Sequence, residues 1–396
     1  MTNLTPAAMP LSSRRKDLRA LVRSPGLMIW CLFLLFSPLY IAPSGLPQPS
    51  DALVFLLVPL SFAGWDRRLD PSANRTLRAL FWFTAWVAVV NYGWALVLWK
   101  WDNLKDFVIH PLFYAFNLAV FASALMLIRR DRGLFLRMSV AVVYLSIGVQ
   151  VVASFFYRTD LYRGELFFNS PNQLGYYALL AACMFAMTQR PLGISRLRAG
   201  LGVTGCAYLA LLSASRASLA GVLVLLVVLL FSNPRTIILA SLAAAGLLTL
   251  GGPLANAIDA AQHRATHRNN PNITFAEERG YDRIWQYPEY LPIGAGEGVY
   301  QRFAKEGERG RELHSSFGSV LFGYGLVGVT LFLVFFVRVI KGSTRRTALM
   351  LVPALLYTIA HQGLRFTMFW VVLAVFVGLK QGPPRATSAA APKSTT

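Results

Sequence analysis

The chain has 396 residues, of which 55% are hydrophobic and only 14% charged, and its mean hydropathy is +0.49. This composition excludes an ordinary soluble domain, because apolar runs of the kind that cross membranes recur along nearly the whole sequence. The formal net charge of +20 would suggest nucleic acid as a partner of a soluble chain. The positions of the basic residues therefore decide what the charge means.

The apolar runs predict an all-α, polytopic membrane protein with about twelve transmembrane helices. The basic N-terminal segment leads into the first run without a small-residue cleavage pattern, so we expect this run to be retained as a span. The predicted spans are 25–42, 51–64, 78–99, 108–128, 134–157, 173–189, 199–213, 217–231, 235–252, 315–338, 347–361 and 366–380.

The basic residues indicate which side of the membrane each connection faces. With the N-terminus inside, the inward segments hold 24 of the 38 basic and 4 of the 18 acidic residues, a net charge of +20. The outward segments hold 14 of each, so their charges cancel. The positive-inside rule therefore predicts that both termini are cytoplasmic, and the charge needs no nucleic-acid partner.

The predicted organisation has one domain and two tails. Residues 1–24 form a cytoplasmic N-terminal tail, 25–380 the transmembrane domain, and 381–396 a polar cytoplasmic tail that we expect to be disordered. The large connection at 253–313, between spans nine and ten, is expected to be periplasmic. The three cysteines lie within apolar runs, at spacings that suit neither a metal site nor a disulfide framework.

Two candidate features stand at the outward ends of short spans. Asn172 follows Pro171 at the start of the sixth span, where it would either cap the helix or contact a substrate. Arg216 lies in the turn Ser213-Ala214-Ser215-Arg216 between two apolar runs. A charge at the edge of the hydrocarbon needs a partner or ligand, unless its side chain extends to the lipid headgroups.

Further candidates surround the re-entry of the long loop into the membrane. Arg283 and Trp285 lie inside the loop, and the alternative for Arg283 is a surface arginine paired with a neighbouring acid. His314 and Ser315 stand at the start of the tenth span, where glycines permit close approach of helices. Histidine suits a general base, although a structural role is the alternative.

The last outward turn carries His361 and Arg365, which we expect to join the same cleft. Arginine binds phosphate oxygens through two parallel hydrogen bonds and keeps its charge at physiological pH, so several around one pocket suit a diphosphate. The outward segments show neither paired carboxylates nor spacing typical of metal ligands. We therefore expect neither a metal nor another cofactor.

The order of these motifs resembles the O-antigen ligase and O-antigen polymerase superfamily of bacterial inner-membrane glycosyltransferases. The resemblance covers about 165–330 and comprises an Asn-Ser-Pro-Asn turn, a Ser-x-Ser-Arg turn, Arg-x-x-Trp, Pro-x-Gly-x-Gly, and a histidine opening a Gly-containing helix. It implies transfer of a glycan from undecaprenyl diphosphate on the periplasmic side. Arg216 and Arg283 would then bind the diphosphate, and His314 would position or deprotonate the acceptor hydroxyl. Ser315 stands where the family often has Asn, which is a departure at the acceptor site.

The first functional hypothesis is a polymerase that joins an undecaprenyl diphosphate-linked oligosaccharide to an acceptor glycan, because nothing in the chain suggests a dedicated site for lipid A-core. A ligase that uses lipid A-core as acceptor is the first alternative. A transporter or flippase of lipid-linked glycan is the alternative from another class. Coupled carriers usually place acids or histidines within their spans, whereas the charged residues here cluster at span ends.

Overall fold

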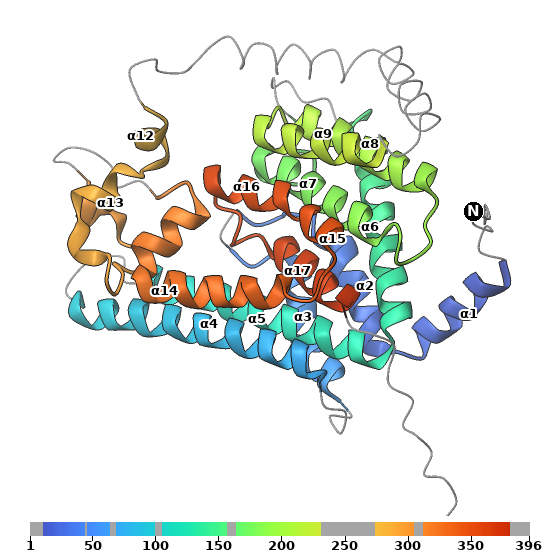
Figure 1. Ribbon diagram of the computed structural model, residues 1–396, viewed down its shortest axis with the longest axis horizontal. Helices are drawn as coiled ribbons and strands as arrows, with labels where there is room; N and C mark the ends of the chain where they lie inside the picture. The colour runs from blue at the N-terminus through green and yellow to red at the C-terminus, as the bar shows by residue number, and fades with distance from the viewer. Residues whose placement is uncertain are drawn as a thin grey trace, which may run out of the picture.

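The computed structural model describes residues 11–43, 46–63, 69–99, 105–156, 164–230, 274–304 and 312–380, and helices are the only regular structure in these ranges (Figure 1). The prediction of an all-helical protein is confirmed for this part of the chain. The helices are α1 (Leu11–Val22), α2 (Pro25–Phe36), α3 (Pro49–Phe62), α4 (Pro71–Val97), α5 (Lys105–Arg130), α6 (Arg132–Ala153), α7 (Pro171–Thr188), α8 (Arg196–Leu212), α9 (Arg216–Leu230), α12 (Phe275–Arg279), α13 (Asp282–Gln286), η1 (Pro288–Tyr290), η2 (Tyr300–Phe303), α14 (Ser316–Ile340), α15 (Arg345–Leu349), α16 (Val352–Ala360) and α17 (Thr367–Lys380).

Four of the described helices, α4, α5, α6 and α14, are long and apolar enough to cross a membrane. Helices also occupy the other predicted spans except 235–252, which lies outside the described residues together with 253–273 and 305–311 of the long loop. One predicted span, 347–361, is divided into α15 and α16. Pro353 lies in the first turn of α16, where its missing N–H costs no helical hydrogen bond.

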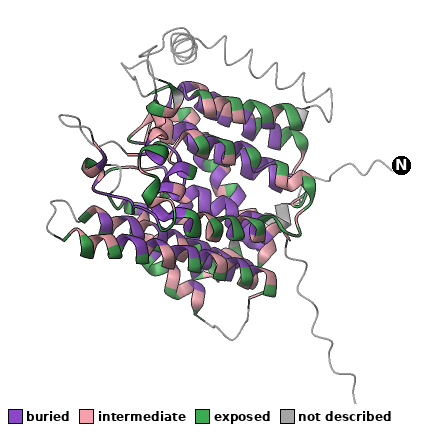
Figure 2. Ribbon diagram, turned by 60° about the vertical axis from the view of Figure 1, so that its left-hand side comes forward, coloured by how far each residue is buried: buried purple, intermediate pink, exposed green. Residues whose placement is uncertain are grey.

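The core and the surface of the bundle are both apolar. Nearly every residue of α7 from Leu174 to Thr188, and of α17 from Met368 to Gly378, is buried, so these two helices form the centre. Large apolar side chains are exposed on α4, α6, α9 and α14, and exposed positions are coloured green in Figure 2. An exposed apolar surface of this extent needs lipid around it, and the protein is a helical membrane protein.

The bundle has two ends with different chemistry. At the first, Arg132 Nε donates to Gly378 O (2.8 Å) and Lys380 Nζ to Arg338 O (2.9 Å). We call this the basic end, because the basic termini of α4, α5, α6, α14 and α17 gather there. The opposite end, which we call the site end, contains the start of α14, the end of α4 and the short helices α12 and α13, on the left of Figure 1.

Candidate functional site

At the site end, α14 is interrupted at Gly325, whose backbone has φ 66° and ψ −169°. The segment 292–298, which carries the Pro-x-Gly-x-Gly motif, lies against this break. The N–H of Ala295 donates to Phe322 O and that of Gly296 to Gly323 O, both at 2.8 Å. These bonds satisfy carbonyls that an unbroken helix would have paired within itself.

Two glycines make this close approach of backbones possible. A Cβ on Gly325 would lie 2.6 Å from the carbonyl carbon of Ile293, and a Cβ on Gly294 2.4 Å from Gly323 O. Both have positive φ. Trp94 Nε1 donates to Gly294 O at 2.9 Å. Irregular backbone within a membrane helix is tolerated where protein surrounds it, as it does here.

Arg283 lies in α13 and is buried, with a relative exposure of 8%. Its guanidinium carbon lies 5.2 Å from the ring centroid of Phe303 and 5.9 Å from that of Phe322. Burial lowers the pKa of Arg283 from its usual value. The alternative of a surface arginine therefore does not describe this side chain. Trp285, in contrast, is 63% exposed.

Arg302 lies in the same cage of aromatic rings as Arg283, because both guanidinium groups contact Phe303. Arg302 was not identified in the sequence, since nothing in its local pattern distinguishes it. Its guanidinium carbon lies 4.5 Å from the Phe303 centroid and 5.2 Å from those of Trp94 and Phe107. Nη2 donates to the carbonyls of Ala295 and Gly296, whereas Nε and Nη1 are buried without a hydrogen-bond partner among the described residues. Burial lowers the pKa of Arg302 to about 10. Two guanidinium groups thus flank one phenylalanine ring.

The start of α14 is fastened to the segment that contains Arg283. The N–H of His314 donates to Arg279 O at 3.0 Å, and Tyr281 Oη lies 2.6 Å from Ser315 Oγ. Ser315 also accepts the Gly318 N–H at 3.1 Å as the N-cap of α14, and is fully buried. The side chain of His314 is exposed. The structure therefore brings the predicted phosphate-binding segment and the predicted acceptor histidine together.

The turn between α16 and α17 joins the same group of residues. Ser316 donates to His361 O through its N–H (3.2 Å) and its hydroxyl (3.0 Å), and the His361 ring stacks on Tyr357 at 4.5 Å between centroids. Tyr281 Oη donates to Ile359 O at 2.7 Å. The turn before α17 is thus held against the start of α14.

Arg365 forms ion pairs within the protein, whereas the sequence suggested that it lines a cleft. Its Nη2 lies 2.7 Å from Glu297 Oε2 and 2.6 Å from Glu312 Oε1, and it donates to Tyr300 Oη at 3.2 Å. These carboxylates raise the pKa of Arg365 although burial opposes the charge. Arg365, which was expected to contact a substrate, is therefore paired with two acidic residues of the protein, and 23% of its side chain is exposed.

Glu297, the inner of these two acids, is only 3% exposed and was also missed in the sequence. Its carboxylate accepts from Tyr114 Oη at 3.1 Å, and its backbone N–H donates to the Asn91 side chain at 3.1 Å. Burial alone would raise the pKa of Glu297, but the charge of Arg365 outweighs it and the pKa is lowered. A single acid in a glycine-rich loop gave no sign that it would be buried between helices.

Asn172 and Arg216 lie in α7 and α9, two helices that pack on α16. The prediction that Asn172 caps its helix is wrong, because the N-cap of α7 is Ser170, whose side chain accepts the Asn172 N–H. Tyr357 Oη donates to Asn172 O at 3.3 Å, which ties α7 to α16. Arg216 is the first residue of α9, which packs on α16. Its side chain is exposed and makes no hydrogen bond or ion pair with another described residue.

His314, Ser315 and His361 therefore meet around the first turn of α14, with α13 beside them, whereas Arg216 and Asn172 lie on α9 and α7. The chain matches no model of a known protein family, and no curated protein matches it in sequence. The site end offers caged guanidinium groups for an anion and an exposed imidazole for a proton.

Proposed function

We propose that the protein is a membrane glycosyltransferase, which transfers a glycan from undecaprenyl diphosphate to an acceptor sugar hydroxyl, as a polymerase of lipid-linked polysaccharide. The observation that carries this proposal is the fastening of residues 279–283 to the start of α14 through His314, Tyr281 and Ser315. These bonds join the segment that leads into α13, which carries the buried Arg283, to the segment that carries the exposed His314.

In the proposed reaction, the oxygen of the acceptor hydroxyl attacks the anomeric carbon of the donor glycan. The bond from that carbon to the phosphate oxygen breaks, and undecaprenyl diphosphate leaves with the electron pair. His314 takes the proton of the hydroxyl, because histidine is the side chain that most often serves as a general base. Arg216 and Arg283 offset the negative charge that develops on the diphosphate, a task for which fixed cations are effective without a metal.

The proposed topology has twelve spans in the bacterial inner membrane, with both termini cytoplasmic and 253–313 in the periplasm. The gathering of basic helix termini at one end of the bundle supports it, because a cytoplasmic face retains such residues. A site on the opposite face has no access to cytoplasmic nucleotide sugars. A membrane-delivered donor such as a lipid diphosphate suits that position.

One observation favours transport as a second candidate function. Broken helices and buried charged groups near the bilayer interior are typical of secondary transporters, and here α14 is broken beside the Glu297–Arg365 pair. Tyr114 donates a hydrogen bond to Glu297, and Arg365 donates one to Tyr300, so the pair also suits a purely structural role.

Purified protein in liposomes, supplied with undecaprenyl diphosphate-linked oligosaccharide, separates these functions. A polymerase lengthens the glycan on the lipid and releases undecaprenyl diphosphate. A ligase needs lipid A-core and yields glycan attached to it. A transporter moves the donor across the bilayer without a new glycosidic bond, and this result would contradict the proposal.

A further inference from the structure

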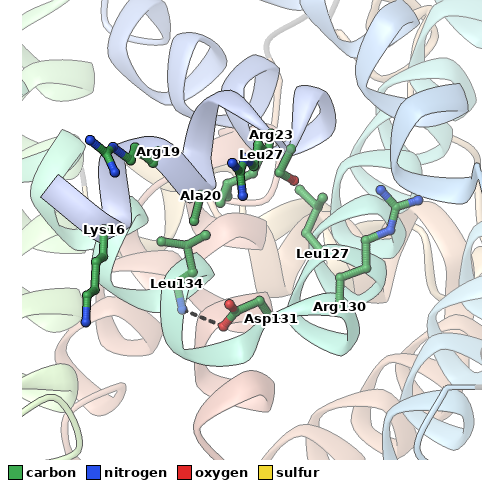
Figure 3. A pocket seen from close by; sticks show the side chains of 10 residues that line it. Lys16, Arg19, Ala20, Arg23, Leu27, Leu127, Arg130, Asp131 and Leu134 are labelled. Carbon is green, nitrogen blue, oxygen red and sulfur yellow. Dashed lines mark hydrogen bonds between the residues drawn. The ribbon is translucent and has the colours of Figure 1, made fainter. Parts of the chain in front are cut away.

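A cavity of about 440 Å³ opens at the basic end, where α1 crosses the turn between α5 and α6. Its volume falls within the range of ~300–1,000 Å³ typical of small-molecule sites. Four basic side chains line it: Lys16 and Arg19 from α1, Arg23 from the turn before α2, and Arg130 from the end of α5. In Figure 3 they are spread around the cavity, with Lys16 and Arg19 at the left, Arg23 near the middle and Arg130 at the right.

These cations have no carboxylate partners in the described part of the chain. Asp17, the acid of α1, is engaged elsewhere, since Arg137 binds both its oxygens at 2.9 and 3.0 Å and so pins α1 to α6. Asp131, the acid of the cavity, caps α6 by accepting the Leu134 N–H at 2.8 Å. Arg130 donates to Ala63 O, which uses only part of its guanidinium. The cavity therefore carries an excess of positive charge.

Apart from Ser24, the remaining lining is apolar, and two of its leucines lie at the ends of candidate membrane spans. Leu127 lies in the last turn of α5 and Leu134 in the first turn of α6, and both helices are long enough to cross the bilayer. Leu27 of α2 completes this surface. The cavity thus combines cations at headgroup level with leucines that can contact acyl chains. Basic pockets between helices at this level suit anionic lipid headgroups.

We propose that this cavity binds an anionic phospholipid with two phosphodiester groups, of the diphosphatidylglycerol class. Four cations spread around one cavity match the two negative charges of such a headgroup better than the single charge of an ordinary phosphodiester lipid. A lipid explains the apolar lining, which a free phosphate or an acidic protein segment would not need. The proposal does not depend on the reaction at the site end.

Binding of diphosphatidylglycerol to the purified protein in neutral-lipid nanodiscs tests this. The double variant Arg19→Gln/Arg23→Gln should bind about 30-fold more weakly, since each cation near the headgroups contributes about fivefold. The matched control is Arg75→Gln/Arg78→Gln, which removes two exposed cations from the start of α4 at the same end, outside the cavity, and should bind like wild type. All four residues are exposed, so neither variant should lose its fold, which thermal unfolding without the lipid would verify.

Equal weakening in both double variants would mean general attraction to an anionic surface and would overturn the proposal. Inorganic diphosphate that competes with the lipid at equal concentration would also overturn it, because the occupant would then be a free phosphate. Binding of an acidic peptide in place of the lipid would have the same consequence.

Discussion

Glu297 and Arg365 lie 68 residues apart in the sequence and form an ion pair whose glutamate is buried, with Arg365 Nη2 2.7 Å from Glu297 Oε2. The glutamate belongs to the segment that fills the break in α14, and the arginine to the turn before α17. The pair therefore couples two polar segments to each other inside an apolar bundle. A second carboxylate, that of Glu312 in the segment before α14, lies 2.6 Å from the same guanidinium.

Arg365→Ala should destabilise the protein by about 3–5 kcal/mol, because it leaves the buried Glu297 without its cation. Arg137→Ala is the matched control. It breaks the ion pair with Asp17, whose two side chains are 33% and 22% exposed, and such a pair contributes about 0–1 kcal/mol. Chemical denaturation in detergent measures both. Equal losses would show that the Glu297–Arg365 pair is no more than a surface contact.

Acid should weaken the fold through Glu297. Its pKa is lowered in the folded protein, so its stabilising contribution is complete above the unfolded value of about 4.3 and disappears as pH falls through the lower folded value. Thermal unfolding between pH 7 and pH 3 should therefore show a loss of stability in the acid range, and Glu297→Gln should reduce that loss. An unchanged acid profile in the variant would mean that Glu297 is not held ionised.

Gly325→Ala should destabilise the site end by roughly 1–3 kcal/mol or more, because the residue has positive φ and a Cβ there would meet the backbone of Ile293. Gly93→Ala is the control, since that glycine lies within α4 and a Cβ would meet nothing within 4 Å. Alanine should be neutral or favourable there. Thermal unfolding of both variants is the measurement. A Gly325→Ala protein as stable as the control would contradict the described break in α14.

Hydropathy predicted most of the helices, because their apolar runs are interrupted by polar segments and many begin at Pro, Ser or a basic residue. It also placed His314 and Ser315 correctly at the start of α14. The break at Gly325 was not predicted, because the run around it is continuously apolar and only the packing of 292–298 against it reveals the interruption.

The site was predicted in part, for a related reason. Arg283 and His314 stood out as a cation and a titratable group at the end of a span. Arg302 and Glu297 did not, since their roles depend on contacts with α4 and α5 that sequence separation hides. For the same reason Arg365 was expected to meet a substrate, whereas Glu297 and Glu312 already bind it.

The proposed membrane topology rests on the distribution of the basic residues, and cysteine labelling tests it. In a cysteine-free background, a cysteine at Ala304 should react with a membrane-impermeant reagent in whole cells, and one at Ser343 should react only after permeabilisation. The native cysteines are all buried, so their replacement should disturb no exposed surface. Labelling of Ser343→Cys but not Ala304→Cys would reverse the proposed topology.

In the proposed site, Arg216 and Arg283 bind the donor and His314 acts on the acceptor. Measurement of donor binding tests this division most directly. Affinity for undecaprenyl diphosphate should fall in Arg216→Lys and Arg283→Lys, because an ammonium cannot reproduce a bidentate guanidinium. Each should lose about 2–4 kcal/mol of transition-state stabilisation, or roughly 30- to 1000-fold in rate. His314→Ala should bind the donor like wild type and transfer no glycan, and Arg78→Lys, at the basic end, should do both normally. If the two site arginine variants and His314→Ala all bind donor like wild type and still transfer glycan, the site lies elsewhere.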